Sequence, residues 1–113
     1  MAGPGIVHVV LFEFKSKATD EQVKDACDRM LGLAQACVHP DTKAPYIKMS
    51  VGGKNNSIEG MEGGLTHGFV VNFENVEDRD YYVKKDPAHQ TFVKSIGDII
   101  ASARVVDFEP GVF

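Results

Sequence analysis

A run of residues towards the C-terminal end, Asp-Pro-Ala-His-Gln-Thr-Phe-Val, contains the side chain best suited to proton transfer, His89. Asp86 and Pro87 are a favoured helix N-cap and first helical residue, so His89 falls in the first turn of a helix. Its spacing from Phe92 and Ile96 places the ring on the apolar face. Burial and the positive end of the helix dipole both disfavour imidazolium, so we expect the neutral imidazole that a general base needs. The alternative is a core histidine that bonds one backbone carbonyl.

Two further histidines, His8 and His67, lie in segments with the composition of strands. If the first and third strands are neighbours, the two rings can lie close together on one face. The alternative is solitary packing or a mutual hydrogen bond. Three histidines are able to bind zinc, but no pair of them has a local ligand spacing and no supporting carboxylate is evident. We therefore expect no metal and no cofactor.

Tyr81 and Tyr82 precede His89 by one short turn and a loop. A phenol beside a neutral imidazole forms an acid–base pair, in which the imidazole removes a proton and the phenol stabilises an oxyanion. We expect Tyr82 to be the hydrogen-bonding acid. The sequence leaves open which of the two tyrosines faces a pocket, and the alternative is a tyrosine that packs beneath the helix.

The elements that position these side chains follow from hydrophobic periodicity and from capping residues. Thr19 and Gln22 form a capping box, Asn75 caps a short helix, and His-Pro-Asp at 39–41 ends the first helix. The pattern predicts strands over 6–15, 45–51, 65–74 and 103–109, helices over 20–38, 76–84 and 87–102, and a Gly-rich loop over 52–64.

The order of these elements is that of the ferredoxin-like split βαβ unit, an α+β fold whose four-stranded antiparallel sheet carries helices on one face. The first strand is apolar on both faces, with Val10 and Phe12 on one side and Val9 and Leu11 on the other. A large apolar patch on a soluble protein usually marks an interface, so we expect two sheets to pair in a homodimer. The alternative is that the C-terminal tail or a loop covers this face.

Length and charge narrow the class of protein. A chain of 113 residues is the size of one domain, and its net charge of -4, with no basic run longer than Lys84-Lys85, argues against nucleic-acid binding. The N-terminal apolar run over 9–12 is too short for a membrane span, so a cytoplasmic location is the default. Cys27 and Cys37 would lie about 15 Å apart on one helix, too far for a disulfide, so we expect free thiols.

Three sequence features together resemble the stress-responsive dimeric A/B-barrel (Dabb) family over residues 5–110: Val-His-Val-Val at 7–10, the Gly-rich run that ends in Leu-Thr-His-Gly at 65–68, and Pro-Ala-His at 87–89. The resemblance implies a sheet that pairs with a second copy into a closed α+β barrel. In the plant polyketide cyclases of this family, a histidine at the position of His89 is the base of an aldol closure and an upstream tyrosine assists it. Histidines at the positions of His8 and His67 line their cavity.

The chain departs from those cyclases at three positions, because Asp86 replaces a histidine, Val83 stands at the literal position of the tyrosine, and Met30 replaces a helix tyrosine. The residues and the resemblance together predict a cofactor-independent cyclase or aldolase-like enzyme for a small polyketide or related carbonyl compound. Its base is His89, its acid is Tyr82, and its substrate pocket includes His8, His67, Met30, Tyr81 and Phe92. The alternative is a non-catalytic stress-response or small-ligand-binding homodimer.

Overall fold

The structure, a computed structural model, describes residues 5–113. Its elements follow in the order β1 (Ile6–Phe14), α1 (Asp20–Ala36), β2 (Ile47–Lys54), β3 (His67–Phe73), α2 (Val76–Lys84), α3 (Pro87–Ile96) and β4 (Ile100–Phe108). The strands form one antiparallel sheet in the order β2-β3-β1-β4. This confirms the predicted α+β, ferredoxin-like architecture.

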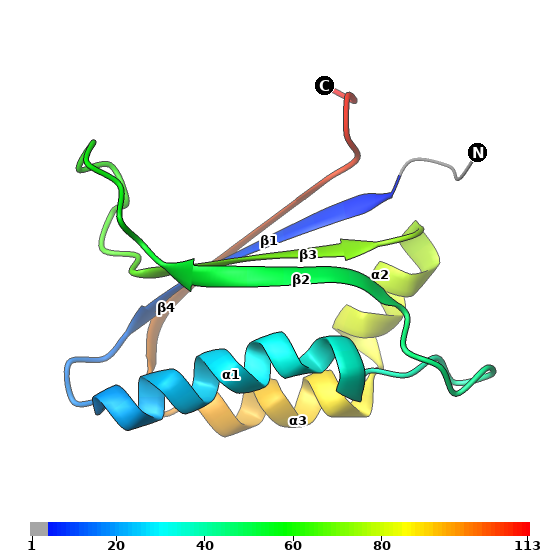
Figure 1. Cartoon of the computed structure of the whole chain (residues 1–113), viewed down its shortest axis with the longest axis horizontal. Helices are drawn as coiled ribbons and strands as arrows, with labels where there is room; N and C mark the ends of the chain where they lie inside the picture. The colour runs from blue at the N-terminus through cyan, green and yellow to red at the C-terminus, as the bar shows by residue number, and fades with distance from the viewer. Residues whose placement is uncertain (1–4) are drawn as a thin grey trace.

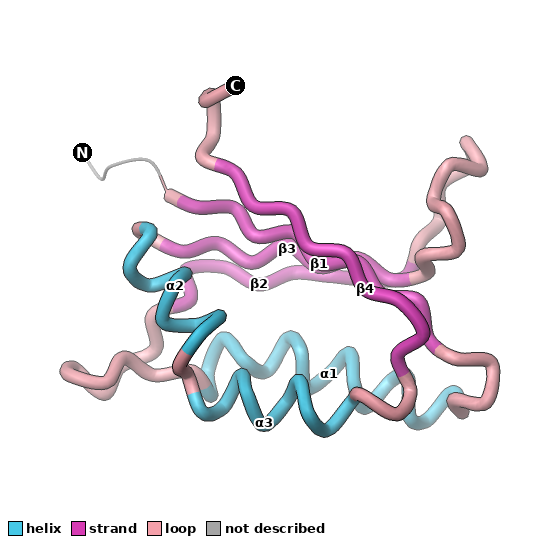
Figure 2. The backbone as a smooth tube through the Cα atoms, turned by 180° about the vertical axis from the view of Figure 1, so that it is seen from behind, coloured by secondary structure: helices cyan, strands magenta, loops and turns pink. Residues whose placement is uncertain are grey.

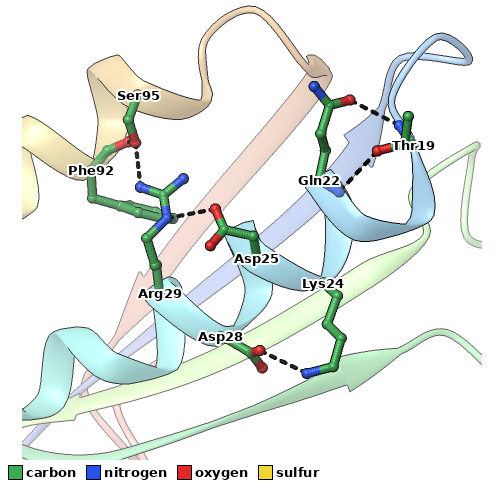
Figure 3. Close-up of polar contacts among 8 residues, drawn as sticks. All are labelled: Thr19, Gln22, Lys24, Asp25, Asp28, Arg29, Phe92 and Ser95. Carbon is green, nitrogen blue, oxygen red and sulfur yellow. Dashed lines mark hydrogen bonds and ion pairs between the residues drawn. The ribbon is translucent and has the colours of Figure 1, made fainter.

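Figure 1 shows that α1 and α3 lie side by side along one face of the sheet, while α2 stands at one end. The opposite view in Figure 2 agrees, and the other face carries no helix within residues 5–113. Arg29 links the two long helices, because its Nη1 donates to Ser95 Oγ at 2.6 Å and its guanidinium lies 5.5 Å from the ring centre of Phe92 (Figure 3).

The inner face of β1 supplies much of the core. Ile6, His8, Val10 and Phe12 alternate along the strand and are all buried. The register sets Val10 beside Phe69 of β3, so the two central strands pack their side chains in one layer beneath the helices. The apolar core comprises Ile6, Val10, Phe12, Ala26, Met30, Leu33, Cys37, Tyr46, Phe69, Val71, Phe73, Tyr82, Phe92 and Ile96.

The outer face of the sheet is also apolar. Val9 pairs with Val70 of β3 and with Val106 of β4, which is 63% exposed, and Val51 of β2 continues the row. The predicted two-sided character of β1 is therefore confirmed. The alternative that the C-terminal tail covers this face is wrong, because the tail points away from the sheet (Figure 1) and Val106 stays exposed. We call this row of partly or fully exposed residues the outer patch: Val7, Val9, Leu11, Val51, Val70, Val106 and Phe108.

The helix starts were predicted correctly. Thr19 Oγ1 accepts from Gln22 N at 3.1 Å and Gln22 Oε1 accepts from Thr19 N at 2.9 Å (Figure 3), which completes the capping box. Asn75 and Asp86 cap α2 and α3 at the expected residues. These starts depend on local side-chain contacts, which the sequence displays directly.

Three element ends were wrong. The helix α3 stops at Ile96, not near 102, because the chain turns at 97–99 and the β-branched pair at Ile99 and Ile100 leads into β4. The strand β2 continues through Gly52 and Gly53 into the predicted loop. The helix α1 ends at Ala36, and Val38 forms a β-bridge with Pro45 instead of a last helical turn.

Both cysteines are free thiols, as expected, although Cys37 caps α1 and does not lie within it. None of the helices within residues 5–113 combines the length and the apolar character needed to cross a membrane.

Candidate active site

A cavity of about 720 Å³ lies between the β1–β4 side of the sheet and the three helices. Its walls are largely apolar, and its polar groups gather where β1 begins and β4 ends. The lining residues are His8, Val10, Phe12, Met30, Arg79, Asp80, Tyr82, Val83, Lys84, His89, Phe92, Val93, Ile96, Gly97, Ile100, Ala103, Val105 and Asp107. A concave, mostly apolar site with a few convergent polar groups is the usual form of a small-molecule site.

The ring of His89 has a defined tautomer. Its Nδ1 lies 2.7 Å from the backbone oxygen of Tyr82, and a carbonyl only accepts hydrogen bonds, so Nδ1 carries the hydrogen. The Nε2 atom is then left with its lone pair, and within residues 5–113 the ring makes no hydrogen bond other than the one from Nδ1. The predicted carbonyl bond of a core histidine is therefore present, but on a ring that lines the cavity.

Burial lowers the pKa of His89 below its ordinary value of 6.5. The hydrogen bond to the Tyr82 carbonyl opposes this effect, His8 lowers the pKa further, and Asp86 raises it. The net direction keeps the imidazole neutral near pH 7. A neutral ring with a free Nε2 in an apolar cavity is able to accept a proton from a bound molecule.

His8 is held from the neighbouring strand. Its Nδ1 lies 2.6 Å from Asp107 Oδ1, and Asp107 Oδ2 accepts from Arg79 Nη1 at 2.9 Å. Arg79 also donates from Nε to Asp80 at 2.8 Å, and these two carboxylates raise the pKa of its guanidinium, Asp80 more than Asp107. The ring of His8 is 5% exposed and meets Tyr82 edge-on with its centre 5.7 Å away.

Asp107 is the main site residue that the sequence did not reveal, because no carboxylate beside the histidines was evident from the sequence alone. The register pairs His8 with Asp107 across β1 and β4, 99 residues apart along the chain. The split βαβ order does place these strands side by side. Only their register, which no local signal fixes, makes the two side chains meet.

Tyr81 and Tyr82 lie in different environments. Tyr82 is fully buried, and its ring stacks on His89 with 3.9 Å between ring centres. Its hydroxyl is enclosed and has no hydrogen-bond partner among the described residues, and burial, followed by Cys37 and Asp86, raises its pKa. Tyr81 does not line the cavity and instead packs edge-on against Tyr46 at 5.8 Å. Tyr82 is therefore the tyrosine that faces the cavity, by its ring.

Met30 and Phe92 line the cavity and are almost fully buried, but His67 lies elsewhere. His67 and His8 do share the inner face of the sheet. The register sets His8 beside Val71, four residues from His67, which separates the two by about 13 Å along the strands. The expectation that these rings meet is therefore wrong.

His67 instead packs edge-on against Phe14, with 5.1 Å between ring centres, and its Nδ1 lies 2.8 Å from Thr66 Oγ1. It lines a second cavity, of about 540 Å³, beneath the opposite end of the sheet. Burial and the charge of Lys54 lower its pKa. The described residues contain no cluster of three or more His, Cys, Asp or Glu side chains able to hold a metal ion.

A comparison with protein families shows where the chain belongs. The family described as the stress-responsive A/B barrel domain, Dabb, matches residues 6–110. The chain is a member of the Dabb family. This finding confirms the resemblance inferred from the sequence, and no curated protein matches the chain.

Solved structures share the fold of this Dabb protein. At3g17210 from Arabidopsis thaliana is 27% identical with a TM-score of 0.81, over 96% of this chain and 97% of that one. A hydroxynitrile lyase from Passiflora edulis is 19% identical with a TM-score of 0.80, over 97% of both chains. A dimeric ferredoxin-like protein of unknown function from Thermobifida fusca is 21% identical with a TM-score of 0.71, over 95% of this chain and 92% of that one.

Proposed function

We propose that this Dabb protein is a cofactor-independent acid–base enzyme of the cyclase or aldolase type, acting on a small polyketide or related carbonyl compound. One observation carries the proposal: His89 donates Nδ1–H to the Tyr82 carbonyl and keeps a free Nε2 in an apolar cavity. A base in this setting is neutral and oriented, two conditions that favour proton abstraction beside a carbonyl.

The proposed reaction begins when His89 Nε2 removes a proton from the carbon next to a carbonyl group. The C–H bond breaks, an N–H bond forms, and the electron pair leaves an enolate. The enolate carbon then attacks a second carbonyl of the same molecule, a C–C bond forms, and the resulting alkoxide takes a proton. The sequence needs no oxidant or reductant, and its reverse breaks a C–C bond by the same proton transfers.

The residue that we propose to stabilise the oxyanion is not Tyr82, the one expected from the sequence. The enclosed hydroxyl of Tyr82 does not reach the cavity, so we assign Tyr82 the role of orienting His89 through its carbonyl and its ring. His8 takes the acid role in this proposal. Asp107 accepts from its Nδ1 and orients the ring, and the doubly protonated ring donates from Nε2 to a developing oxyanion.

The Passiflora edulis protein supports catalysis on this fold, because it is described as a hydroxynitrile lyase. Its identity of 19% supports the fold alone, whereas the cavity of about 720 Å³ with largely apolar walls suits a small, mostly apolar carbonyl compound. Met30 and Phe92 would contact the apolar part of the substrate, because they lie in the wall beside the two histidines.

A second candidate is a binding protein without catalysis. One observation favours it: a bond from Nδ1 to a backbone carbonyl is also what a structural histidine makes, and His89 has that bond. In this reading the cavity stores or senses a small apolar ligand, and His89 contributes to stability alone.

We also propose that the working form is a homodimer in the cytoplasm. The outer patch is apolar and at least partly exposed, and the Thermobifida fusca and Bacteroides fragilis relatives are described as dimeric. Pairing two outer patches buries them and makes a closed barrel. Two free thiols, Cys27 and Cys37, suit a reducing compartment.

A substrate screen separates the two candidates. Linear polyketo acids and thioesters, aldehydes and cyanohydrins are incubated with wild type, His89→Ala and His67→Asn. We expect turnover by wild type, a loss of roughly a hundredfold or more in His89→Ala, and little change in His67→Asn, whose ring lies outside the cavity. Equal turnover by wild type and His89→Ala contradicts the proposal, whereas saturable binding without turnover supports the second candidate.

A further inference from the structure

Within residues 5–113, Asp86 is the only acidic side chain that is buried, with 1% of its surface exposed. Burying a carboxylate is costly unless hydrogen bonds compensate for the lost water. Its Oδ1 accepts the backbone N–H of Ala88 at 2.9 Å and of His89 at 3.4 Å, and its Oδ2 accepts the hydroxyl of Tyr46 at 2.5 Å. None of these contacts takes part in the proton transfer proposed above.

The carboxylate does more than cap α3. Capping alone needs no charge, since the neutral amide of Asn75 accepts from Asp78 N at 2.8 Å at the start of α2. The second oxygen of Asp86 points away from the helix backbone and reaches Tyr46, just before β2. Burial, followed by the bond to Asp86, raises the pKa of Tyr46, so its proton stays on the phenol and the bond is kept.

This bond connects the sheet to the first turn of α3. The ring of Tyr46 stacks near Phe73 of β3, with 6.2 Å between ring centres, and meets Tyr81 of α2 edge-on. The ring that carries the hydroxyl is therefore packed from two sides. His89 is the third residue of α3, and two hydrogen bonds hold it. Its backbone N–H donates to Asp86, and its ring Nδ1–H donates to the Tyr82 carbonyl.

We infer that Asp86, braced by Tyr46, is a positioning residue that fixes the first turn of α3, so that His89 keeps Nδ1 on the Tyr82 carbonyl and Nε2 towards the cavity. The inference deepens the proposed function and rests on it for its purpose. Its test measures the His89 ring without substrate, so the outcome for the geometry and the outcome for catalysis are independent. A substrate screen that fails leaves this geometry standing, and the reverse also holds.

The test is imidazole nitrogen NMR on ¹⁵N-labelled protein at about pH 8, above the ordinary pKa of histidine. In wild type we expect the Nδ1–H tautomer of His89 to dominate. In Asp86→Ala the Nε2–H tautomer should increase at least about fivefold, the factor that corresponds to the net worth of one ordinary hydrogen bond. Asp86→Asn should restore most of the wild-type ring, because its amide oxygen still caps the helix, and should leave only the smaller change that loss of the acceptor for Tyr46 produces.

Two further variants complete the design. Tyr46→Phe keeps the cap and removes only the hydrogen bond from Tyr46 to Asp86, so we expect a smaller increase of the Nε2–H tautomer. Asn75→Ala removes the cap of α2, which does not touch His89, and should leave the ring unchanged. A wild-type ring spectrum in folded Asp86→Ala overturns the inference. If Asp86→Ala does not fold, Tyr46→Phe decides: a shifted tautomer balance supports the inference, and an unchanged ring overturns it.

Discussion

His8, His67 and His89 lie in three different environments, and the hydrogen-bond partner of each ring determines what chemistry it can perform. His89 donates to a carbonyl and keeps a lone pair on Nε2, whereas His8 donates from Nδ1 to the Asp107 carboxylate. His67 lies under the far end of the sheet beside Thr66. Residue type alone did not separate them; the group bonded to each Nδ1 does.

The lowered pKa of His89 predicts a pH dependence of stability. Because the folded pKa lies below the unfolded value of 6.5, the unfolded chain binds more protons near that pH, and the free energy of unfolding rises with pH. The neutral-ring contribution is fully present above 6.5 and is lost as pH falls below it. His89→Asn, which still donates to the Tyr82 carbonyl, should flatten this loss in urea denaturation between about pH 7 and about pH 5.

His67 has a lowered pKa as well, so His67→Asn should remove the part of the pH dependence that comes from His67. The stability of the double variant should change less with pH than that of either single variant. A wild-type protein that grows more stable as the pH falls over this range contradicts the assignment of neutral rings.

The sequence revealed His89 but not its partners, for a physical reason. An N-cap, a proline and an apolar helical face are local features, and they were enough to place His89 in a first turn. The contact of His8 with Asp107 depends on the register of β1 and β4, and the choice between Tyr81 and Tyr82 depends on the phase of a nine-residue helix. Tertiary packing determines both features, so the local sequence pattern did not predict them.

At the level of elements, helix starts were predictable and strand ends were not. Gly52 explains one error. Glycines usually signal a turn, yet a Cβ at Gly52 would lie 2.2 Å from Phe69 Cδ1 and 2.8 Å from Gly68 O. Glycine is present here because β2 packs closely on β3, and the pattern of a loop and the pattern of a crowded strand look alike in sequence.

Gly52→Ala should therefore destabilise the protein by about 1–3 kcal/mol, the usual cost of overpacking. Gly53→Ala is the matched control, because a Cβ there meets nothing within 4 Å, and it should change the unfolding free energy by less than about 0.5 kcal/mol. Urea denaturation of the two variants measures the difference. Equal stability of the two would show that the contact with Phe69 and Gly68 carries no cost.

For the whole molecule, the outer patch predicts association. We expect a dimer at micromolar concentration that buries roughly 800 Å² per subunit. Val9→Asp places a charge at the centre of the patch and should give monomers, whereas Val112→Asp, in the exposed tail, should leave the dimer intact. Sedimentation velocity distinguishes these states, and a wild-type monomer of 12.3 kDa contradicts the assembly.

The same pairing links unfolding to dissociation. The melting temperature should rise with protein concentration, because dilution favours separated chains. Differential scanning calorimetry over a hundredfold range of concentration is the measurement, with Val9→Asp as the variant that should lose the dependence. A melting temperature that stays constant in wild type excludes an obligate dimer.

The central claim is that His89 is a neutral, cavity-facing base, and titration of its ring by NMR tests this most directly. We expect an Nδ1–H tautomer at pH 7 and a titration midpoint below the ordinary value of 6.5, because burial outweighs the carbonyl bond and Asp86. Absence of these resonances in His89→Ala secures the assignment. A midpoint above 7 means that the ring is cationic at neutral pH, which contradicts its role as the base.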